Sequence, residues 1–434
     1  MQVFQYPDQT KWTTLQQRAA AQEAQEIEQR VQSIFLDVRQ RGDVALRDYA
    51  QQFDGVQLQD LRVTPEEIAA AVAQVPAELQ TAIRQAHANI WKFHATQRTE
   101  EKPVETMPGV TCWRRSVPVQ RVGLYIPGGT APLFSTLLML GVPARLAGCP
   151  EVVLTTPPQK DGSVNSVILF TAQLLGISTI IKAGGAQAIA ALTGGTDSVP
   201  AVDKIFGPGN RYVTAAKQLA TRYGVAIDMP AGPSEVLVIA DATANPSFVA
   251  ADLLSQAEHG PDSQVILVSD SMAVIEQTQA EIERQLATLP RAAVATQALN
   301  ESRAILLRTP EDMLYFSNQY APEHLILAVQ NPEQLAEGVT SAGSVFLGHY
   351  TPEAAGDYAS GTNHTLPTNG YARNYSGVSL DSFLKKITYQ RITAQGLLNV
   401  GPVVETMAEA EGLSAHARAV TLRLEAVAGT AQAL

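Results

Sequence analysis

The stretch VGLYIPGG at residues 122–129 decides the fold, because a short apolar run there passes directly into a Pro-Gly-Gly turn. Such a run is typical of a buried strand that ends at a tight turn. Three runs downstream, at residues 152–155, 179–182 and 204–206, also end in Gly or Pro turns, and a helical pattern follows each. Strand, turn and helix in repetition predict a parallel sheet, since parallel neighbours need a crossover connection.

A second series of apolar runs lies at residues 236–240, 264–268, 304–308, 325–329 and 343–347. We therefore predict an α/β protein with two parallel-sheet modules, one inserted into the other. The expected domains are an N-terminal arm at 1–20, a discontinuous α/β domain at 21–120 and 235–378, a second α/β domain at 121–234, and a tail at 379–434. The tail ends in a helix expected at 412–428 and must pack on a larger surface.

The first hundred residues have helical patterns. Residues 22–41 carry apolar side chains three to four positions apart, which predicts one buried stripe. Thr64 precedes Pro65 and two glutamates, so we expect Thr64 to cap a helix. A further helix is expected at 78–94.

Composition excludes several classes of protein. The chain has 434 residues, 45% of them hydrophobic and 17% charged, and a net charge of -11, with no basic run that would bind nucleic acid or an anionic membrane. No signal peptide or membrane span is expected, and two cysteines are too few for a disulfide framework. We expect a cytoplasmic enzyme that acts on a small molecule.

Four polar clusters stand out as candidate chemistry, and we expect them on loops at the carboxyl ends of strands, where open α/β sheets place their sites. Gln256 and His259 are three apart and would share a helix face as half of a metal site, or simply end that helix. Glu323 and His324 precede a strand and offer two proton-transfer groups, and a solvated turn is an equally weighted alternative.

The other two clusters lie nearer the C-terminus. The loop from Asp357 to His364 combines a carboxylate and an imidazole with turn residues, and Glu411 and His416 lie at the start of the last helix. Each could be ordinary surface. Four of the seven histidines fall in these clusters, and a set of two histidines with two oxygen donors would suit zinc.

Cofactor motifs are weaker. No G-x-G-x-x-G fingerprint occurs, and the Gly207-Pro208-Gly209 turn has Tyr212 where the third glycine should be, which argues against a standard Rossmann phosphate loop. Cys112 and Cys149 could be nucleophiles toward an aldehyde, but the apolar surroundings of Cys149 favour structural burial.

In order along the chain, several motifs resemble the histidinol dehydrogenase family from about residue 20 to the C-terminus. They are GLYIPGG at 123–129, AGGAQAIA at 183–190, FGPGN at 206–210, AGPSE at 231–235, LSQAEHG at 254–260, APEHL at 321–325 and the loop at 357–364. The resemblance implies two incomplete Rossmann-like modules. It also implies NAD-dependent oxidation of L-histidinol, through L-histidinaldehyde, to L-histidine in the last steps of histidine biosynthesis.

The resemblance also implies roles for individual residues. His324 would be the base for the alcohol step, and Glu323 would activate water for the aldehyde step. The implied zinc ligands are Gln256, His259, Asp357 and His416. The implied substrate contacts are Ser234, Gln256, His259, His324, Asp357, His364, Glu411 and His416, and the implied NAD contacts are Tyr125, Gln187 and Asn210. The family is a homodimer whose tail reaches the partner's site. Two rival hypotheses, a zinc hydrolase and a non-catalytic metal-binding scaffold, would show no turnover of histidinol with NAD.

Overall fold

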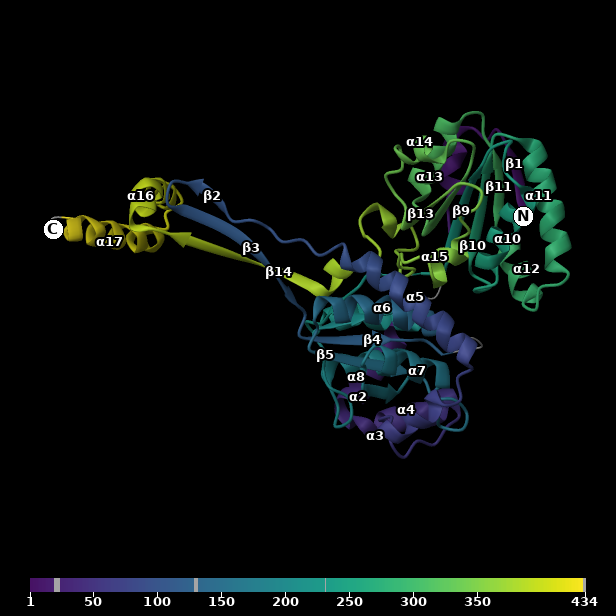
Figure 1. Ribbon diagram of the computed structural model, residues 1–434, viewed down its shortest axis with the longest axis horizontal. Coiled ribbons are helices and arrows are strands. Elements are labelled where there is room, and N and C mark those ends of the chain that lie inside the picture. The colour runs from purple at the N-terminus through teal and green to yellow at the C-terminus, as the bar shows by residue number, and fades with distance from the viewer. Residues whose placement is uncertain (19–23, 129–131, 231, 432–434) are drawn as a thin grey trace. The chain divides into compact units, whose positions relative to one another are not determined.

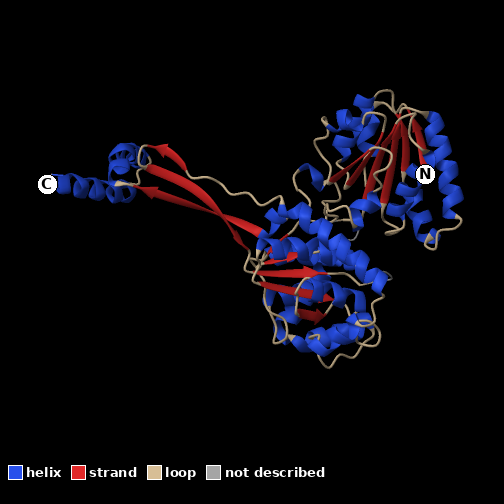
Figure 2. Ribbon diagram, viewed as in Figure 1, coloured by secondary structure: helices blue, strands red, loops and turns tan. Residues whose placement is uncertain are grey.

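The computed structural model describes residues 1–18, 24–128, 132–230 and 232–431. The chain forms two compact units (Figure 1): unit 1 comprises Met1–Gln97 and Val119–Phe383, and unit 2 comprises Arg98–Pro118 and Leu384–Leu434. Unit 1 contains both predicted parallel sheets, and unit 2 contains a small antiparallel sheet with two helices (Figure 2). Among the described residues, no helix is long and apolar enough to cross a membrane.

The first sheet of unit 1 is parallel throughout and has the strand order β6-β5-β4-β7-β8. Its strands are β4 (Arg121–Tyr125), β5 (Glu151–Thr156), β6 (Thr179–Lys182), β7 (Lys204–Phe206) and β8 (Ala226–Ile227). Four helices connect them: α6 (Phe134–Ala147), α7 (Ser166–Leu174), α8 (Gly185–Gly194) and α9 (Arg211–Thr221). The four predicted strands are confirmed to within one residue at each end, and the two-residue β8 was not predicted.

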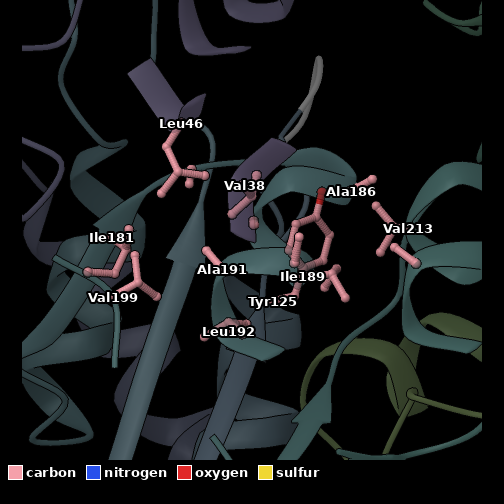
Figure 3. Packing of buried hydrophobic residues seen from close by; sticks show 14 of the residues in the cluster. Val38, Leu46, Tyr125, Ile181, Ala186, Ile189, Ala191, Leu192, Val199 and Val213 are labelled. Atoms are coloured by element: carbon pink, nitrogen blue, oxygen red, sulfur yellow. The ribbon is translucent and has the colours of Figure 1, made fainter. Parts of the chain in front are cut away.

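The N-terminal helices pack on the helices that cover this first sheet. They are α2 (Ala24–Arg41), α3 (Asp43–Tyr49), the π-helix η2 (Ala50–Asp54), α4 (Pro65–Val72) and α5 (Ala77–Ala95). Phe35 and Val38 of the predicted apolar stripe share one hydrophobic cluster with Ile189 of α8 and Val213 of α9 (Figure 3). We expected residues 21–120 to join the module at 235–378. The structure differs, because the apolar stripe of α2 is buried against the other module.

The predicted helix start at Thr64 is confirmed. Its hydroxyl oxygen accepts a hydrogen bond from the backbone N–H of Glu67 at 3.2 Å, and the Glu67 carboxylate accepts one from the Thr64 N–H at 2.7 Å. This reciprocal capping box satisfies two N–H groups that the first turn would otherwise leave unpaired.

The second sheet is also parallel, with the order β1-β11-β10-β9-β12-β13. Its strands are β1 (Gln2–Gln5), β9 (Glu235–Ala240), β10 (Gln264–Ser269), β11 (Arg303–Leu306), β12 (His324–Ala328) and β13 (Ser344–Leu347). The covering helices are α10 (Pro246–Ala257), α11 (Met272–Leu286), α12 (Ala292–Asn300), α13 (Pro310–Tyr320), α14 (Pro332–Ala336) and α15 (Glu353–Tyr358). The predicted strands are confirmed. The segment predicted as an N-terminal arm, 1–20, contains the edge strand β1, which pairs with β11 and belongs to this sheet.

Each face of the second sheet has its own core. One hydrophobic cluster contains Val238 and Leu267 with α10 and α11, and the other contains Leu237 and Ile266 with α13. Alternate residues of each strand therefore point to opposite faces, both covered by helices, as parallel sheets require.

Unit 2 is built from two distant segments. Strands β2 (Val104–Met107), β3 (Val110–Pro118) and β14 (Leu384–Ile392) form an antiparallel sheet in the order β14-β3-β2, followed by helices α16 (Ala394–Ala410) and α17 (Ser414–Ala431). The predicted final helix corresponds to α17. The tail does not stand alone, since residues 98–118 supply two of its three strands.

Candidate active site

A buried histidine at the start of β12 is the centre of the candidate site. The Nδ1 atom of His324 lies 3.1 Å from the backbone carbonyl oxygen of Glu235. A carbonyl only accepts, so Nδ1 carries the hydrogen and Nε2 carries the lone pair. Among the described residues, Nε2 has no hydrogen-bond partner although it is fully buried. A buried polar atom without a partner is costly, and at a site it is typical of an atom that awaits a ligand.

Three carboxylates surround this histidine. Glu323 Oε2 and Glu353 Oε1 lie 3.7 Å and 3.6 Å from Nδ1 of His324, and Asp357 Oδ1 lies 3.6 Å from Nε2. Burial by itself would lower the pKa of His324, but Glu353, Glu323 and Asp357 outweigh it and raise that pKa to about 10. The site therefore stabilises positive charge on the ring.

Glu323 has the opposite character. Burial raises the pKa of this carboxyl to about 8, although His324 and the backbone N–H of Glu235, which donates to Glu323 Oε2 at 2.9 Å, oppose the shift. A carboxyl group that titrates near neutral pH can act as a general base or acid under physiological conditions.

Helix α15 brings two of the carboxylates to the ring. Glu353 and Asp357 are four residues apart, so they lie on one face of this helix. Burial would raise the pKa of Asp357, yet His324, His364 and His259 together lower it. Asp357 is therefore an anion beside three imidazoles, as a metal ligand would be before the cation arrives.

Helix α10 ends at the same site. Gln256 is fully buried near the end of α10, and only one orientation of its amide satisfies the neighbours. In that orientation the nitrogen donates to Glu353 Oε1, and the oxygen shares the Glu235 N–H, at 3.1 Å, with Glu323 Oε2. His259 follows α10 within electrostatic range of Asp357. The structure thus brings together three of the four predicted metal ligands.

His364 has both ring nitrogens engaged. Its Nδ1 lies 2.8 Å from the backbone oxygen of Asp357 and its Nε2 lies 3.0 Å from Thr136 Oγ1. Burial lowers the pKa of His364, so the ring is neutral and accepts from the threonine hydroxyl at Nε2. Ser234 directly precedes β9, whose first residue is Glu235.

The edge of the sheet differs from the expectation. Glu235 and His324 begin β9 and β12, and Gln256 and His259 precede β10, so these groups lie at the amino edge of the parallel strands rather than at the carboxyl edge. The sequence contained the signal, since the motifs at 255–260 and 321–325 come just before predicted strands. The carboxyl-edge rule describes crevices that bind nucleotides and does not cover this cluster.

Glu411 and His416 belong to unit 2. Glu411 follows α16 and His416 lies in the first turn of α17, and both side chains are exposed. Of the described residues, the compact acid–histidine group that could hold a cation is His324, Glu353 and Asp357, whose donor atoms lie within 4.8 Å of one another. Glu353 was not predicted from the sequence, and its spacing of four from Asp357 was the available signal.

A cavity of about 1270 Å³ opens at the carboxyl edge of the first sheet. Tyr125, Gln187 and Asn210, the three residues expected to contact NAD, all line it. The Tyr125 hydroxyl accepts the N–H of Gly185 at 3.1 Å, and the Asn210 side chain caps α9. The cavity is large enough for a dinucleotide, and its place at the strand ends is the usual one for such ligands.

Cys149 and Asp54 are two further ionisable groups outside the His324 cluster. Burial raises the pKa of Cys149 to about 11, so this thiol is not an activated nucleophile. Asp54 lines the cavity and was not predicted. Its Oδ2 atom is buried without a partner in the described part of the chain, and burial raises its pKa.

A base with a free nitrogen in a buried site, together with a dinucleotide-sized cavity on a half-Rossmann sheet, defines an NAD-linked dehydrogenase of α/β fold. The histidinol dehydrogenase family profile matches residues 17–424. The chain is 57% identical to the histidinol dehydrogenase of Bacteroides thetaiotaomicron over 98% of this chain and 99% of that one, and 57% identical to that of Xanthomonas campestris over 92% and 93%. The crystal structure of the Elizabethkingia anophelis enzyme superposes with a TM-score of 0.95 at 57% identity and covers 98% of both chains. The chain therefore belongs to the histidinol dehydrogenase family, whose members oxidise histidinol with NAD in histidine biosynthesis.

Proposed function

We propose that this chain oxidises L-histidinol through L-histidinaldehyde to L-histidine, with two NAD⁺ reduced per turnover. The observation that carries the proposal is the buried His324, whose Nε2 has no partner among the described residues while Glu323 lies beside it. Alcohol oxidation needs a base for the hydroxyl proton, and the second oxidation needs a base for water. Two adjacent groups of different basicity supply both.

His324 is the base of the first oxidation in this proposal. The basic form is the neutral ring: its Nε2 accepts the hydroxyl proton as the carbinol carbon gives up its hydride, and the ring becomes positively charged. Glu353, Glu323 and Asp357 stabilise that charge, as the raised pKa of His324 indicates. The Glu235 carbonyl keeps the hydrogen on Nδ1, so the lone pair stays on the reacting side.

Glu323 is the base of the second oxidation. Its carboxylate removes a proton from the water that adds to the aldehyde carbon, and the hydrate then loses the second hydride. A pKa near 8 makes the Glu323 carboxylate a stronger base than an exposed glutamate. Because both bases belong to one site, the reactive aldehyde need not leave between the steps.

A zinc ion fits the donors at this site. The proposed ligands are Gln256, His259, Asp357 and His416. The fit rests on the lowered pKa of Asp357 near three imidazoles and on the buried Gln256 amide, which contacts Glu353, one helical turn before Asp357. When bound, zinc would orient the amino and imidazole nitrogens of histidinol. The proposed substrate contacts are Ser234, Gln256, His259, His324, Asp357, His364, Glu411 and His416.

NAD⁺, the hydride acceptor, is proposed to bind in the cavity at the first sheet, in contact with Tyr125, Gln187 and Asn210. The proposed assembly is a homodimer in which Glu411 and His416 serve the partner's site. A cytoplasmic location is proposed as well, in keeping with two free cysteines. Of the predicted domain division, the second α/β domain at 121–234 stays a proposal.

The test is an assay of the purified protein with histidinol and NAD⁺, followed by absorbance of the reduced cofactor. Two reduced cofactors per histidinol consumed are expected, with histidine as the product. A zinc hydrolase or a metal-binding scaffold would reduce no NAD⁺, and that result would reject the proposal.

A further inference from the structure

Glu353 is a buried carboxylate that the proposed mechanism does not use directly. It is the first residue of α15 and is only 1% exposed. Its two oxygens face different partners: Oε2 accepts from the Ser255 hydroxyl at 3.4 Å, and Oε1 faces the Gln256 amide and His324. Burying an ionisable group is costly unless it is hydrogen-bonded. The deep burial of the Glu353 carboxylate therefore calls for a structural explanation.

The amide of Gln256 supplies that reason. A glutamine amide has one oxygen that can bind a cation and one nitrogen that cannot, and the two ends have nearly the same shape. In its ionised form the Glu353 carboxylate only accepts hydrogen bonds, so that form can face only the amide nitrogen. The oxygen is then turned toward the Glu235 N–H at 3.1 Å, and its second lone pair remains available.

His324 is held from the same side. Glu353 Oε1 lies 3.6 Å from Nδ1, which is too long for a hydrogen bond but close enough for electrostatic attraction. This attraction favours the hydrogen on Nδ1, in the same sense as the Glu235 carbonyl at 3.1 Å. One carboxylate thus acts on a metal-ligand candidate and on the base.

We propose that Glu353 is a positioning residue, which holds the amide nitrogen of Gln256 so that the amide oxygen keeps a lone pair for a metal, and which keeps the free nitrogen of His324 at Nε2. This inference rests on the proposed function, because it assumes that Gln256 binds the metal. It explains how an amide, an uncommon zinc ligand, can serve here: its orientation is fixed by a charged neighbour.

A direct ligand role for Glu353 is the competing explanation. The donor atoms of His324, Glu353 and Asp357 are close enough to share a cation. Against it, Ser255 and Gln256 already occupy the two oxygens of Glu353. The two explanations predict different coordination spheres, and this difference makes them separable.

The experiment measures zinc affinity by competition with a chromophoric chelator in the full-length wild type, Glu353→Gln and Glu353→Asp. Loss of an outer-sphere partner typically weakens metal binding about 10–100-fold, and we expect Glu353→Gln to fall in this range. Its amide can present either end to Gln256, so the orientation is lost without a change of volume. Glu353→Asp keeps the negative charge but moves it away from Gln256, because the side chain is one methylene shorter. It replaces Glu353→Gln in the comparison with wild type if Glu353→Gln does not fold.

Glu67→Gln is the matched control. Glu67 also lies in the first turn of a helix, α4, and pairs with Lys182 in the first module. Its loss should lower thermal stability but leave zinc affinity as in the wild type. If Glu67→Gln and Glu353→Gln weaken zinc equally, the effect is general destabilisation and the positioning role is rejected.

Cobalt substitution separates positioning from ligation. At saturating Co²⁺, the visible d–d spectrum of Glu353→Gln should match that of the wild type, because the same donors remain. A changed spectrum would show that Glu353 is itself a metal ligand. An unchanged zinc affinity of Glu353→Gln would show that Glu353 does not position the metal ligands. Either result overturns the inference. A wild type that binds no zinc would instead refute the proposed metal function, and the inference with it.

Discussion

The Nδ1 atom of His324 lies 3.1 Å from the backbone carbonyl oxygen of Glu235, across the paired strands β12 and β9. The contact joins the His324 side chain to the backbone of a central strand. Substitutions on the protein surface would not move that backbone. It determines the tautomer of the ring and so makes Nε2 the basic nitrogen. Strand register, rather than a loop, therefore decides which atom of His324 is available for the proposed chemistry.

The two bases should be separable by mutation. His324→Asn is expected to slow oxidation of histidinol about 10²–10⁴-fold, the usual cost of losing a general base. Glu323→Gln should slow oxidation of histidinaldehyde by a similar factor and spare the first step. Single-turnover measurements with each substrate give the two rates separately. Equal losses of both half-reactions in both variants would contradict the division of roles.

Metal removal should abolish turnover and leave the fold intact. The proposed ligands in unit 1 lie at the ends of α10 and α15, whereas each sheet has its own hydrophobic cluster. Prolonged dialysis against a chelator should therefore eliminate activity while the far-ultraviolet circular dichroism at 25 °C stays unchanged. Added Zn²⁺ should restore the rate. Full turnover in protein shown to be metal-free would refute the metal role.

Asn210 can be tested apart from its capping role. Its side-chain oxygen accepts the backbone N–H groups of Tyr212 and Val213 at 3.0 Å and 3.1 Å. Asn210→Ala should cost about 1 kcal/mol of stability through loss of the cap. Asn210→Ser keeps a capping oxygen and should retain stability.

Both Asn210 variants should nevertheless raise KM for NAD⁺ if the side chain contacts the cofactor, and kcat should change little. Steady-state kinetics at saturating histidinol provide the measurement, with thermal unfolding as the control. A wild-type KM in the stable Asn210→Ser variant would remove Asn210 from the cofactor site.

His94 gives a pH dependence of stability away from the metal site. It is buried, its Nδ1 donates to Gln97 Oε1 at 2.9 Å, and its Nε2 accepts from Asn363 Nδ2 at 3.4 Å. Burial lowers the pKa of His94 in the folded state. Below pH 6.5, about the pKa of histidine in the unfolded chain, only the unfolded chain gains this proton. The free energy of unfolding therefore decreases as the pH is lowered, by up to about 1.4 kcal/mol per pH unit.

The comparison is between wild type and His94→Gln at pH 8 and pH 5.5. The variant should be less stable at pH 8, by about 1–3 kcal/mol for the disturbed buried hydrogen bonds. It should lose less additional stability at pH 5.5 than the wild type does. Parallel loss in both proteins, measured by thermal unfolding, would show that His94 does not carry the acid sensitivity.

The sequence predicted the central strands better than the edges. Strands such as β5 and β9 contain apolar runs with a proline within two residues of the strand start, and burial on both faces leaves a strong pattern. The edge strands β1 and β8 are only four and two residues long, so their sequences carry little pattern, and pairing with β11 and β7 makes them strands. The antiparallel pairing of residues 110–118 with 384–392 joins segments too distant for any local pattern to reveal.

The sequence predicted several residues of the candidate site but not how they are arranged in space. The motifs supplied Gln256, His324 and Asp357, which the structure does bring together. They did not indicate Glu353, because a glutamate at the first turn of a short helix is ordinary in sequence, and only its burial beside His324 is unusual. The edge of the sheet was predicted wrongly, although the motifs at 255–260 and 321–325 come just before their strands and so pointed to the amino edge.

The last prediction concerns His416, which lies in unit 2 while the other proposed ligands lie in unit 1. If the tail serves the partner, zinc is held by Gln256, His259 and Asp357 of one chain and by His416 of the other. Homodimers of His259→Ala or of His416→Ala should be nearly inactive, since each site then lacks one of four ligands. In a mixed dimer both lesions fall in one site and the other site is intact. Random association makes about half of the dimers mixed, so coexpression should restore roughly a quarter of wild-type activity. Two differently tagged chains purified in tandem give the mixed species alone, and it should show about half of wild-type activity by the same site count. Mixed dimers that form but stay inactive would place His416 in the site of its own subunit.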